Sequence, residues 1–404
     1  MQIHNGAGRR EADGRELLID VSRLIWRAWR GRAATGIDRV CMAYVERFGS
    51  RAQAVVQRRG RILVLSPRHS DRIFRGVSRG LGVPKVELAM TVAGALRGAR
   101  SSPPRAWMTY LNVGHTGLDE PALPRWIAAN RVNAVYLVHD LIPLTHPQYC
   151  RAGEADRHAR RMIHALGSAR GILANSSQTL AELRNFTNAR GLPMPPNVAA
   201  WISGYDGPTA VEPMSLGRPH FVTVGTIEAR KNHLLLLSAW DQLVADMGAH
   251  APILVIIGGR GWEAEETIRR LDELGPLRDH VREIGSCSDG ELAAWIAGAQ
   301  ALLMPSFVEG FGLPVIESLA LGTPVIASDL PVYREIVGDL PTYLDPADSS
   351  AWVRTIRAFI GATPERTARL KQMRGYRAPS WDDHFKTVET WLAELPPHTA
   401  LHPE

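Results

Sequence analysis

The stretch Pro305–Glu317 constrains the fold of this chain more than any other part of its sequence. It follows the apolar run Ala301–Met304, which has the length and composition of a buried strand in a parallel sheet. Gly310 and Gly312 then permit a tight turn, and Pro314 suits the first turn of a helix that begins near Gly312. The pattern predicts a strand, a turn and a helix N-terminus, whose unpaired N–H groups favour an anionic ligand.

Two carboxylates bracket the start of this predicted helix. Glu309 precedes it, and Glu317 lies one to two turns inside it. Carboxylates repel phosphate but can accept hydrogen bonds from hydroxyl groups, and a nucleotide diphosphate sugar carries hydroxyls on both sides of its diphosphate. The alternative is a purely structural strand–turn–helix unit with one capping Glu.

The full string favours the ligand site. Residues 309–317 read Glu-Gly-Phe-Gly-Leu-Pro-Val-Ile-Glu, and residues 322–328 read Gly-Thr-Pro-Val-Ile-Ala-Ser. This pattern resembles the signature of retaining glycosyltransferases of family 4, also called glycosyl transferases group 1. The resemblance implies an α/β protein with the GT-B fold: two facing Rossmann-like domains, a cleft between them, and a C-terminal helix that crosses back.

A second motif supplies positive charge. The predicted strand His220–Val224 is followed by Gly225 and, five and six residues later, by Arg230 and Lys231. Arginine can bind two phosphate oxygens at once, and lysine acts as a mobile point charge. A merely solvated helix start is less favoured, because cations there oppose the helix dipole. Gly-Thr-x-Glu-x-Arg-Lys-Asn also resembles the donor-phosphate motif of the same family.

Three stretches of the first half carry further candidates. Residues 35–40, Thr-Gly-Ile-Asp-Arg-Val, open a predicted helix with Thr35 as its N-cap. The predicted strand 134–138 ends at His139 and Asp140, and the strand 107–113 leads to His115. Ligands of open α/β sheets bind at the carboxyl ends of the strands. His-Asp-Leu-Ile-Pro-Leu-x-His-Pro resembles the acceptor-domain motif of the family.

The resemblance assigns roles residue by residue. It implies a catalytic role for His139, Arg230, Lys231 and Glu309. It implies donor binding by Gly36, Gly225, Arg230, Lys231, Ile284, Ser286, Glu309, Gly310, Phe311, Gly312, Leu313 and Glu317. It implies acceptor binding by His115 and Asp140. Because two cations can neutralise the diphosphate and no Asp-x-Asp-type pair stands in a suitable loop, we expect no metal and no cofactor beyond the nucleotide sugar substrate.

The length of the chain and a segment rich in Gly and Pro predict the domain organisation. A chain of 404 residues accommodates two domains of ordinary size. Residues 190–218 are rich in Gly and Pro, which indicates a linker. We therefore predict an acceptor-binding domain over 1–205, a donor-binding domain over 206–378, and a crossover helix with a tail over 379–404.

Charge is distributed unequally between the two halves. Residues 1–210 contain 30 Lys and Arg against 15 Asp and Glu, a net +15, whereas the remainder carries −9. A basic half suggests an anionic partner: a membrane face, a lipid diphosphate or nucleic acid. No nucleic-acid-binding motif accompanies the charge, which excludes that partner from our expectation. A predicted loop at 23–32 combines Trp and Arg and suits either a membrane interface or a lid; an Arg-rich composition alone is the remaining alternative.

The cysteines and the apolar segments indicate where in the cell the protein is expected. Cys41, Cys150 and Cys287 lie far apart without metal spacing, which favours a reducing cytoplasm. No apolar run reaches the ~20 residues that span a bilayer, and the start of the chain lacks an apolar signal core. We expect a cytoplasmic protein that binds peripherally to the inner face of an anionic membrane.

The expected reaction transfers a sugar, first choice mannose from GDP-mannose, to a glycan or polyprenyl-diphosphate-linked acceptor in bacterial surface polysaccharide synthesis. The resemblance implies retention at the anomeric carbon. The alternatives are a family member that uses a UDP-sugar, a nucleotide-sugar epimerase or hydrolase on the same fold, and a catalytically silent glycan-binding protein.

Overall fold

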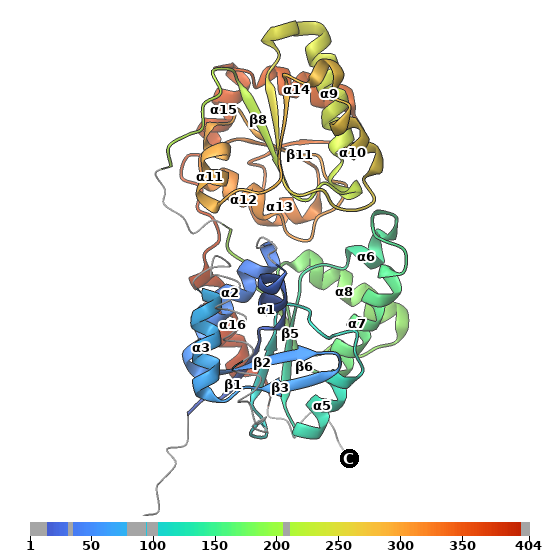
Figure 1. Ribbon diagram of the computed structural model, residues 1–404, viewed down its shortest axis with the longest axis vertical. Coiled ribbons are helices and arrows are strands. Elements are labelled where there is room, and N and C mark those ends of the chain that lie inside the picture. Colours follow the sequence, from blue (N-terminus) through green and yellow to red (C-terminus); the bar gives the residue numbers. More distant parts are fainter. Residues whose placement is uncertain (1–13, 31–34, 79–93, 95–103, 205–210, 397–404) are drawn as a thin grey trace, which may run out of the picture. The chain divides into compact units, whose positions relative to one another are not determined.

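Two largely parallel β-sheets organise the chain (Figure 1). The computed structural model describes residues 14–30, 35–78, 94, 104–204 and 211–396. Contacts divide them into two compact units: one runs to residue 137 and includes 167–171, and the other comprises 138–166 and 172–395.

The first sheet has seven strands in the order β3-β2-β1-β4-β5-β6-β7. Strand β3 runs antiparallel to β2, and β1 is parallel to both β2 and β4. Its strands are β1 (Leu17–Asp20), β2 (Ala52–Arg58), β3 (Arg61–Val64), β4 (Thr109–Asn112), β5 (Asn133–Val138), β6 (Ala169–Ala174) and β7 (Asn197–Ala199). The helices of this part are α1 (Ser22–Trp29), α2 (Gly36–Phe48), α3 (Pro67–Ser78), α5 (Ala122–Asn130), α6 (Ile142–Thr145), α7 (Glu154–Ser168) and α8 (Ser177–Arg190).

The second sheet has six parallel strands in the order β10-β9-β8-β11-β12-β13. They are β8 (His220–Val224), β9 (Ile253–Ile257), β10 (Val281–Ile284), β11 (Leu302–Met304), β12 (Val325–Ser328) and β13 (Thr342–Leu344). The helices that follow β8 in the chain are α9 (His233–Met247), α10 (Glu265–Asp272), α11 (Asp289–Gly298), α12 (Leu313–Ala320), α13 (Pro331–Val337), α14 (Ser349–Ala358), α15 (Pro364–Gln372) and α16 (Trp381–Glu394). This strand order reverses direction beside β8, as in doubly wound nucleotide-binding folds.

The core of the second sheet explains its stability. Alternate residues of the central strands point into one apolar cluster with side chains of α9, α10 and α14. Trp240 and Trp352 are fully buried there, and the Trp240 ring meets Phe221 edge-on at 5.9 Å. The indole N–H of Trp240 donates to the Pro252 carbonyl at 2.9 Å, so its only polar group is satisfied.

Most predicted elements are confirmed within one or two residues. Strand β8 has the predicted bounds, and α12 starts directly after Gly312. Thr35 is the N-cap residue of α2, and the Ser176 hydroxyl caps α8 by accepting from the Thr179 N–H at 3.0 Å.

Two predicted segments are wrong. The Trp/Arg segment described as a loop forms helix α1 up to Trp29, because Leu24, Ile25 and Ala28 bury one face of it; residues 31–34 lie outside the described residues. The predicted linker 190–218 contains strand β7, which pairs in parallel with β6. Helix α3 lies in a stretch for which the sequence predicts no element; residues 79–93 and 95–103 lie outside the described residues.

In the described part of the chain no helix combines the length and apolarity needed to cross a bilayer. The last helix, α16, begins after Ser380, whose hydroxyl accepts from the Asp383 N–H. The ring of His384 on this helix lies 3.2 Å from the Trp201 carbonyl, two residues beyond β7.

Candidate active site

Three parallel strands of the second sheet, β8, β9 and β11, deliver loops to one edge. Gly225 follows β8, Gly258 follows β9, and Pro305 follows β11. The β8 and β11 loops are tied together, because the Phe307 N–H donates to the Arg230 carbonyl at 2.8 Å. The Asn232 amide reinforces this link by donating to the Pro305 carbonyl at 3.2 Å. These bonds bring the two predicted motifs together.

A buried ion cluster results. The Lys231 Nζ lies 2.6 Å from Glu309 Oε1, and the Arg230 Nη1 lies 2.8 Å from Glu309 Oε2. The Ser306 hydroxyl donates to Glu309 Oε1 at 2.7 Å. The side chains of Glu309 and Lys231 are only 7% and 9% exposed, so these interactions are weakly screened by solvent.

The sequence did not indicate two partners of this cluster. Glu228 Oε1 lies 2.6 Å from Arg230 Nη2, and the Val308 carbonyl accepts from Arg230 Nη1 at 3.1 Å. Glu228 stood in the motif without an assigned role; its acidic side chain two residues before Arg230 was the available signal. Arg230 therefore lies between two carboxylates and is fixed in orientation.

The pKa values follow from this arrangement. Burial opposes ionisation of Glu309, but Arg230 and Lys231 outweigh it and lower its pKa to about 2. Burial raises the pKa of Glu228, and its contact with Arg230 only partly offsets that. Burial lowers the pKa of Lys231 although Glu309 stabilises its charge. Of the two carboxylates, Glu309 is therefore the one whose ionised form the cluster stabilises.

The glycine turn before α12 has the geometry that the sequence indicates. Gly312 has φ +108°, and a Cβ there would lie 2.4 Å from the buried Tyr333 ring. Phe311 is buried, and Leu313 begins the helix after the Gly312 N-cap. Glu317 is buried inside α12, so the two carboxylates bracket the helix start as predicted.

Replacing Gly312 by alanine is expected to disable this turn. The alanine would have to keep the positive φ of this position, and its Cβ would clash with the Tyr333 ring. The clash would either shift α12 or strain the backbone. We expect a loss of about 1–3 kcal/mol in the free energy of unfolding and reduced donor affinity. Urea denaturation measures the first quantity, with Gly322→Ala as a control: that glycine also has a positive φ but no atom within 4 Å of its Cβ position. Equal costs at both positions would show that contact with Tyr333 is unimportant.

The other donor candidates of this sheet occupy the same edge. A Cβ on Gly225 would lie 3.0 Å from Lys231 Cε, so the lysine stem packs on the bare glycine. Ile284 ends β10, and its carbonyl accepts from the Gly258 N–H at 2.8 Å. Ser286 follows in the next loop and is exposed. Their roles in binding a base stay predictions.

The acceptor candidates lie at the carboxyl ends of strands in the first sheet. His139 is buried directly after β5, and the Asn175 amide holds its carbonyl at 2.8 Å. The carboxylate of Asp140 accepts from the Ile142 N–H at 3.1 Å, which shapes the turn. His115 has φ +58°, and its Nε2 lies 2.8 Å from the Leu137 carbonyl. Asn175 is a positioning residue that the sequence did not reveal.

Gly36 is the first residue of α2, and that helix start is unusually well anchored. Asp38 is fully buried and accepts from the Thr35 N–H at 2.7 Å. Arg23 and Arg27 of α1 pair with the same carboxylate at 2.8 and 2.7 Å. The structure thus holds Gly36 on a rigid helix start.

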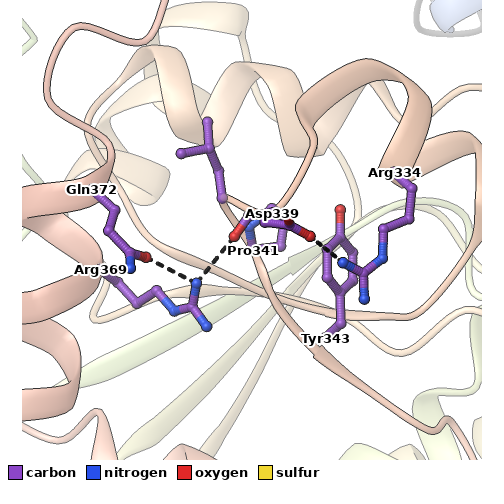
Figure 2. A pocket seen from close by; sticks show the side chains of 7 residues that line it. Arg334, Asp339, Pro341, Tyr343, Arg369 and Gln372 are labelled. Atoms are coloured by element: carbon purple, nitrogen blue, oxygen red, sulfur yellow. Dashed lines mark hydrogen bonds and ion pairs between the residues drawn. The ribbon is translucent and has the colours of Figure 1, made fainter.

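Figure 2 shows a separate surface cavity of about 480 Å³. It is lined by residues of α13, β13 and α15, among them Arg334, Tyr343 and Arg369. The Arg334 guanidinium is already paired with Asp329 and stacked 4.0 Å from the Tyr343 ring. None of the predicted site residues lines this cavity, so it is not the site predicted from the sequence.

Fold and site together define the class of protein. Two sheets of this topology, with a cationic loop and a glycine turn at the carboxyl edge of the second, form the GT-B architecture of glycosyltransferases. The Anabaena protein HepE, solved in complex with UDP-glucose, has this fold: the TM-score is 0.65 at 14% identity, over 93% of this chain and 99% of that one.

The sequence comparison is more specific. Residues 210–374 match the family model described as Glycosyl transferases group 1. O-antigen chain mannosyltransferase B of Escherichia coli is 30% identical over 226 residues, which are 54% of this chain and 58% of that protein. The serotype-specific mannosyltransferase WbdA of Escherichia coli is 29% identical over 286 residues, 64% of this chain and 30% of that protein. The chain thus spans less than two thirds of the length of these relatives.

Proposed function

We propose that this chain transfers mannose from GDP-mannose, with retention at the anomeric carbon, to a glycan or polyprenyl-diphosphate-linked acceptor of a bacterial surface polysaccharide. The observation that carries the proposal is the ion-paired couple of Arg230, 21% exposed, and Lys231, 9% exposed, at the carboxyl edge of a glycosyl transferases group 1 domain. The similarity to O-antigen mannosyltransferases supports the choice of sugar.

In this proposal the cations act on the leaving group. The acceptor hydroxyl oxygen bonds to the anomeric carbon on the face from which the diphosphate departs, and a phosphate oxygen takes the hydroxyl proton. Arg230 and Lys231 stabilise the negative charge that develops on the diphosphate. Glu309 orients both cations and, with Glu317, is placed to meet donor hydroxyls, whereas His139 faces the transferred sugar.

A panel of nucleotide sugars tests the donor. We expect GDP-mannose to raise the melting temperature and to be consumed, with UDP-glucose, UDP-galactose and UDP-N-acetylglucosamine giving smaller shifts. Stabilisation and turnover by a UDP-sugar alone would replace mannose transfer with the UDP-sugar alternative. Binding without turnover, in the presence of acceptor, would favour a silent glycan-binding protein.

Activity is expected to survive an excess of chelator. Two cationic side chains can neutralise the diphosphate, so the proposed chemistry requires no divalent ion. The measurement compares initial rates with EDTA, without it, and after adding back magnesium or manganese. Loss of activity with EDTA and its return with either metal would contradict the proposed charge stabilisation.

We also propose that the basic first part docks on an anionic membrane, with the contact on α3. The segment around Trp26 and Arg27 is less suited to this role than its sequence suggested. Arg27 pairs with the buried Asp38, and the Trp26 indole donates to the Gln57 carbonyl. On α3, by contrast, Arg68, Arg72 and Arg75 are exposed at positions i, i+4 and i+7, so they share one helix face.

The part of the chain that contains α3 is strongly basic. Residues 14–30 and 35–78 contain thirteen arginines and five carboxylates. Asp20 and Asp38 are buried, and Asp71, the one acid of α3, pairs with Arg15 at 2.9 Å. Within the described residues no ion pair involves Arg68, Arg72 or Arg75, so their charge is available to an anionic surface.

Replacing these three arginines by glutamine is expected to release the protein from anionic vesicles. Each basic residue near such a surface contributes about 1 kcal/mol, and the effect weakens with salt because charges are screened over about 8 Å at physiological ionic strength. Flotation with neutral and anionic liposomes measures this. The control is a triple variant with the same change in charge, in which glutamine replaces Arg278, Arg282 and Arg354. These three arginines are exposed and lie in the part of the chain that forms the second sheet. Equal flotation of both triple variants would show that α3 is not the contact.

A further inference from the structure

Glu228 has no role in the reaction as described so far, yet it is built into the cation cluster. Its side chain is 5% exposed and reaches one edge of the Arg230 guanidinium, at 2.6 Å from Nη2. The neighbouring edge of the same guanidinium, through Nη1, is held by Glu309 at 2.8 Å and by the Val308 carbonyl. Glu228 thus takes up one N–H of Nη2, which is one of the groups through which Arg230 could bind a phosphate oxygen.

The charges of the cluster balance without a donor. Arg230 and Lys231 contribute two positive charges, and Glu228 and Glu309 contribute two negative ones. The diphosphate of a nucleotide sugar adds two negative charges. In a buried site such an excess is costly unless a carboxylate leaves or is neutralised, and buried groups usually respond by changing protonation.

The two carboxylates differ in their ability to take up a proton. Glu309 contacts both cations and the Ser306 hydroxyl, and its pKa is held at about 2. The Glu228 carboxylate forms its ion pair with Arg230, and burial already raises its pKa. Addition of an anion beside Arg230 would raise it further, since like charges disfavour ionisation.

We propose that Glu228 positions Arg230 in the donor-free protein and accepts one proton from solvent when the donor diphosphate binds, which frees an Arg230 N–H edge for a phosphate oxygen. This inference rests on the proposed function, because it requires a diphosphate donor at this cluster. No other bond is made or broken in the step, and both cations remain protonated throughout.

Several neighbouring groups could also exchange protons and must be distinguished from Glu228. Lys231 and Glu309 belong to the cluster; Cys150 interacts electrostatically with Glu228, and Asp140 with Arg230. Beside the cluster, burial keeps the pKa of His233 near 4 and that of Tyr333 far above neutrality. Replacing Glu228 alone by its uncharged isostere separates its contribution from theirs.

The test is isothermal titration calorimetry with GDP-mannose and, in parallel, UDP-glucose. In both ligands each phosphate is esterified, so the ligand itself does not titrate near neutrality, unlike free GDP. Titrations near neutral pH in buffers of different ionisation enthalpy count the protons taken up. Titrations over a range of pH give the slope of Kd. The variants are Glu228→Gln and the control Asp241→Asn, an exposed carboxylate paired with Arg270 at 2.7 Å.

The wild type and Asp241→Asn are expected to take up close to one proton, and their Kd should rise with pH by up to tenfold per unit. Glu228→Gln should take up none and bind with a Kd that is independent of pH in the same range. A pH slope that persists in Glu228→Gln, or no uptake by the wild type, would overturn the inference and leave the proposed function standing. Failure of both nucleotide sugars to bind would overturn both.

Discussion

Arg230→Ala and Lys231→Ala are each expected to lower the turnover number about a hundredfold to a thousandfold. Both side chains donate to Glu309 in one ion cluster, and in the proposed reaction they stabilise charge on the leaving diphosphate. Removing one preorganised donor to a developing anion costs about 2.7–4 kcal/mol in the transition state. Initial rates at saturating donor measure the effect.

The fold of both variants should survive. In Arg230→Ala, Glu309 keeps Lys231 and Ser306 as partners, and in Lys231→Ala it keeps Arg230 and Ser306. Circular dichroism checks this, and Arg270→Ala, which removes an exposed cation of α10, is the matched control. Near-normal turnover in both cluster variants would refute the assignment of the diphosphate to this pair.

Glu309→Gln is expected to destabilise the protein without ligand by about 3–5 kcal/mol, because it leaves the buried Lys231 and the partly buried Arg230 without their shared anion. A bound nucleotide sugar should restore much of this loss by supplying negative charge. Urea denaturation with and without ligand measures both effects, and Asp241→Asn should cost at most about 1 kcal/mol, since its ion pair is exposed. Equal stability of the two variants would show that the cluster contributes little.

The same cluster predicts a pH dependence. The pKa of Glu309 falls from an ordinary 4.5 to about 2 in the folded protein, because Arg230 and Lys231 overcome the burial of its carboxylate. A depressed pKa stabilises the folded state above the unfolded-state pKa and loses that contribution as the pH falls through the folded-state value. The wild type should therefore lose stability between pH 4.5 and about 2 more steeply than Glu309→Gln. Parallel acid titrations of the two proteins would contradict this.

Local patterns in the sequence predicted the parts of the fold that depend on local interactions. The bounds of β8, the helix start after Gly312 and the cap at Thr35 follow from apolar runs and from residues that bond to their own backbone. Strand β7 was missed because three residues among prolines carry little pattern, and its pairing with β6 decides its conformation.

Interactions between distant segments explain the rest. Helix α1 buries Leu24 and Ile25, but its Trp and Arg residues suggest a surface loop. The partner of Arg27 is the buried Asp38, which lies eleven residues further along the chain and cannot be recognised from the local pattern. For the site, the sequence indicated Arg230, Lys231 and Glu309 as separate motifs. That all three meet in one ion cluster depends on the hydrogen bonds between the β8 and β11 loops, which no local pattern encodes.

Transfer from radiolabelled GDP-mannose tests the central claim most directly. The purified protein is incubated with a panel of alkyl mannosides and polyprenyl-diphosphate-linked glycans, and the products are treated with α- or β-mannosidase. GDP-mannose carries an α-linked sugar, so retention predicts a product from which α-mannosidase releases the labelled mannose. The rate at which this product forms should be reduced at least a hundredfold in Lys231→Ala. Label recovered only as free mannose or as an epimerised nucleotide sugar, or a product cleaved by β-mannosidase alone, would contradict retaining mannosyl transfer.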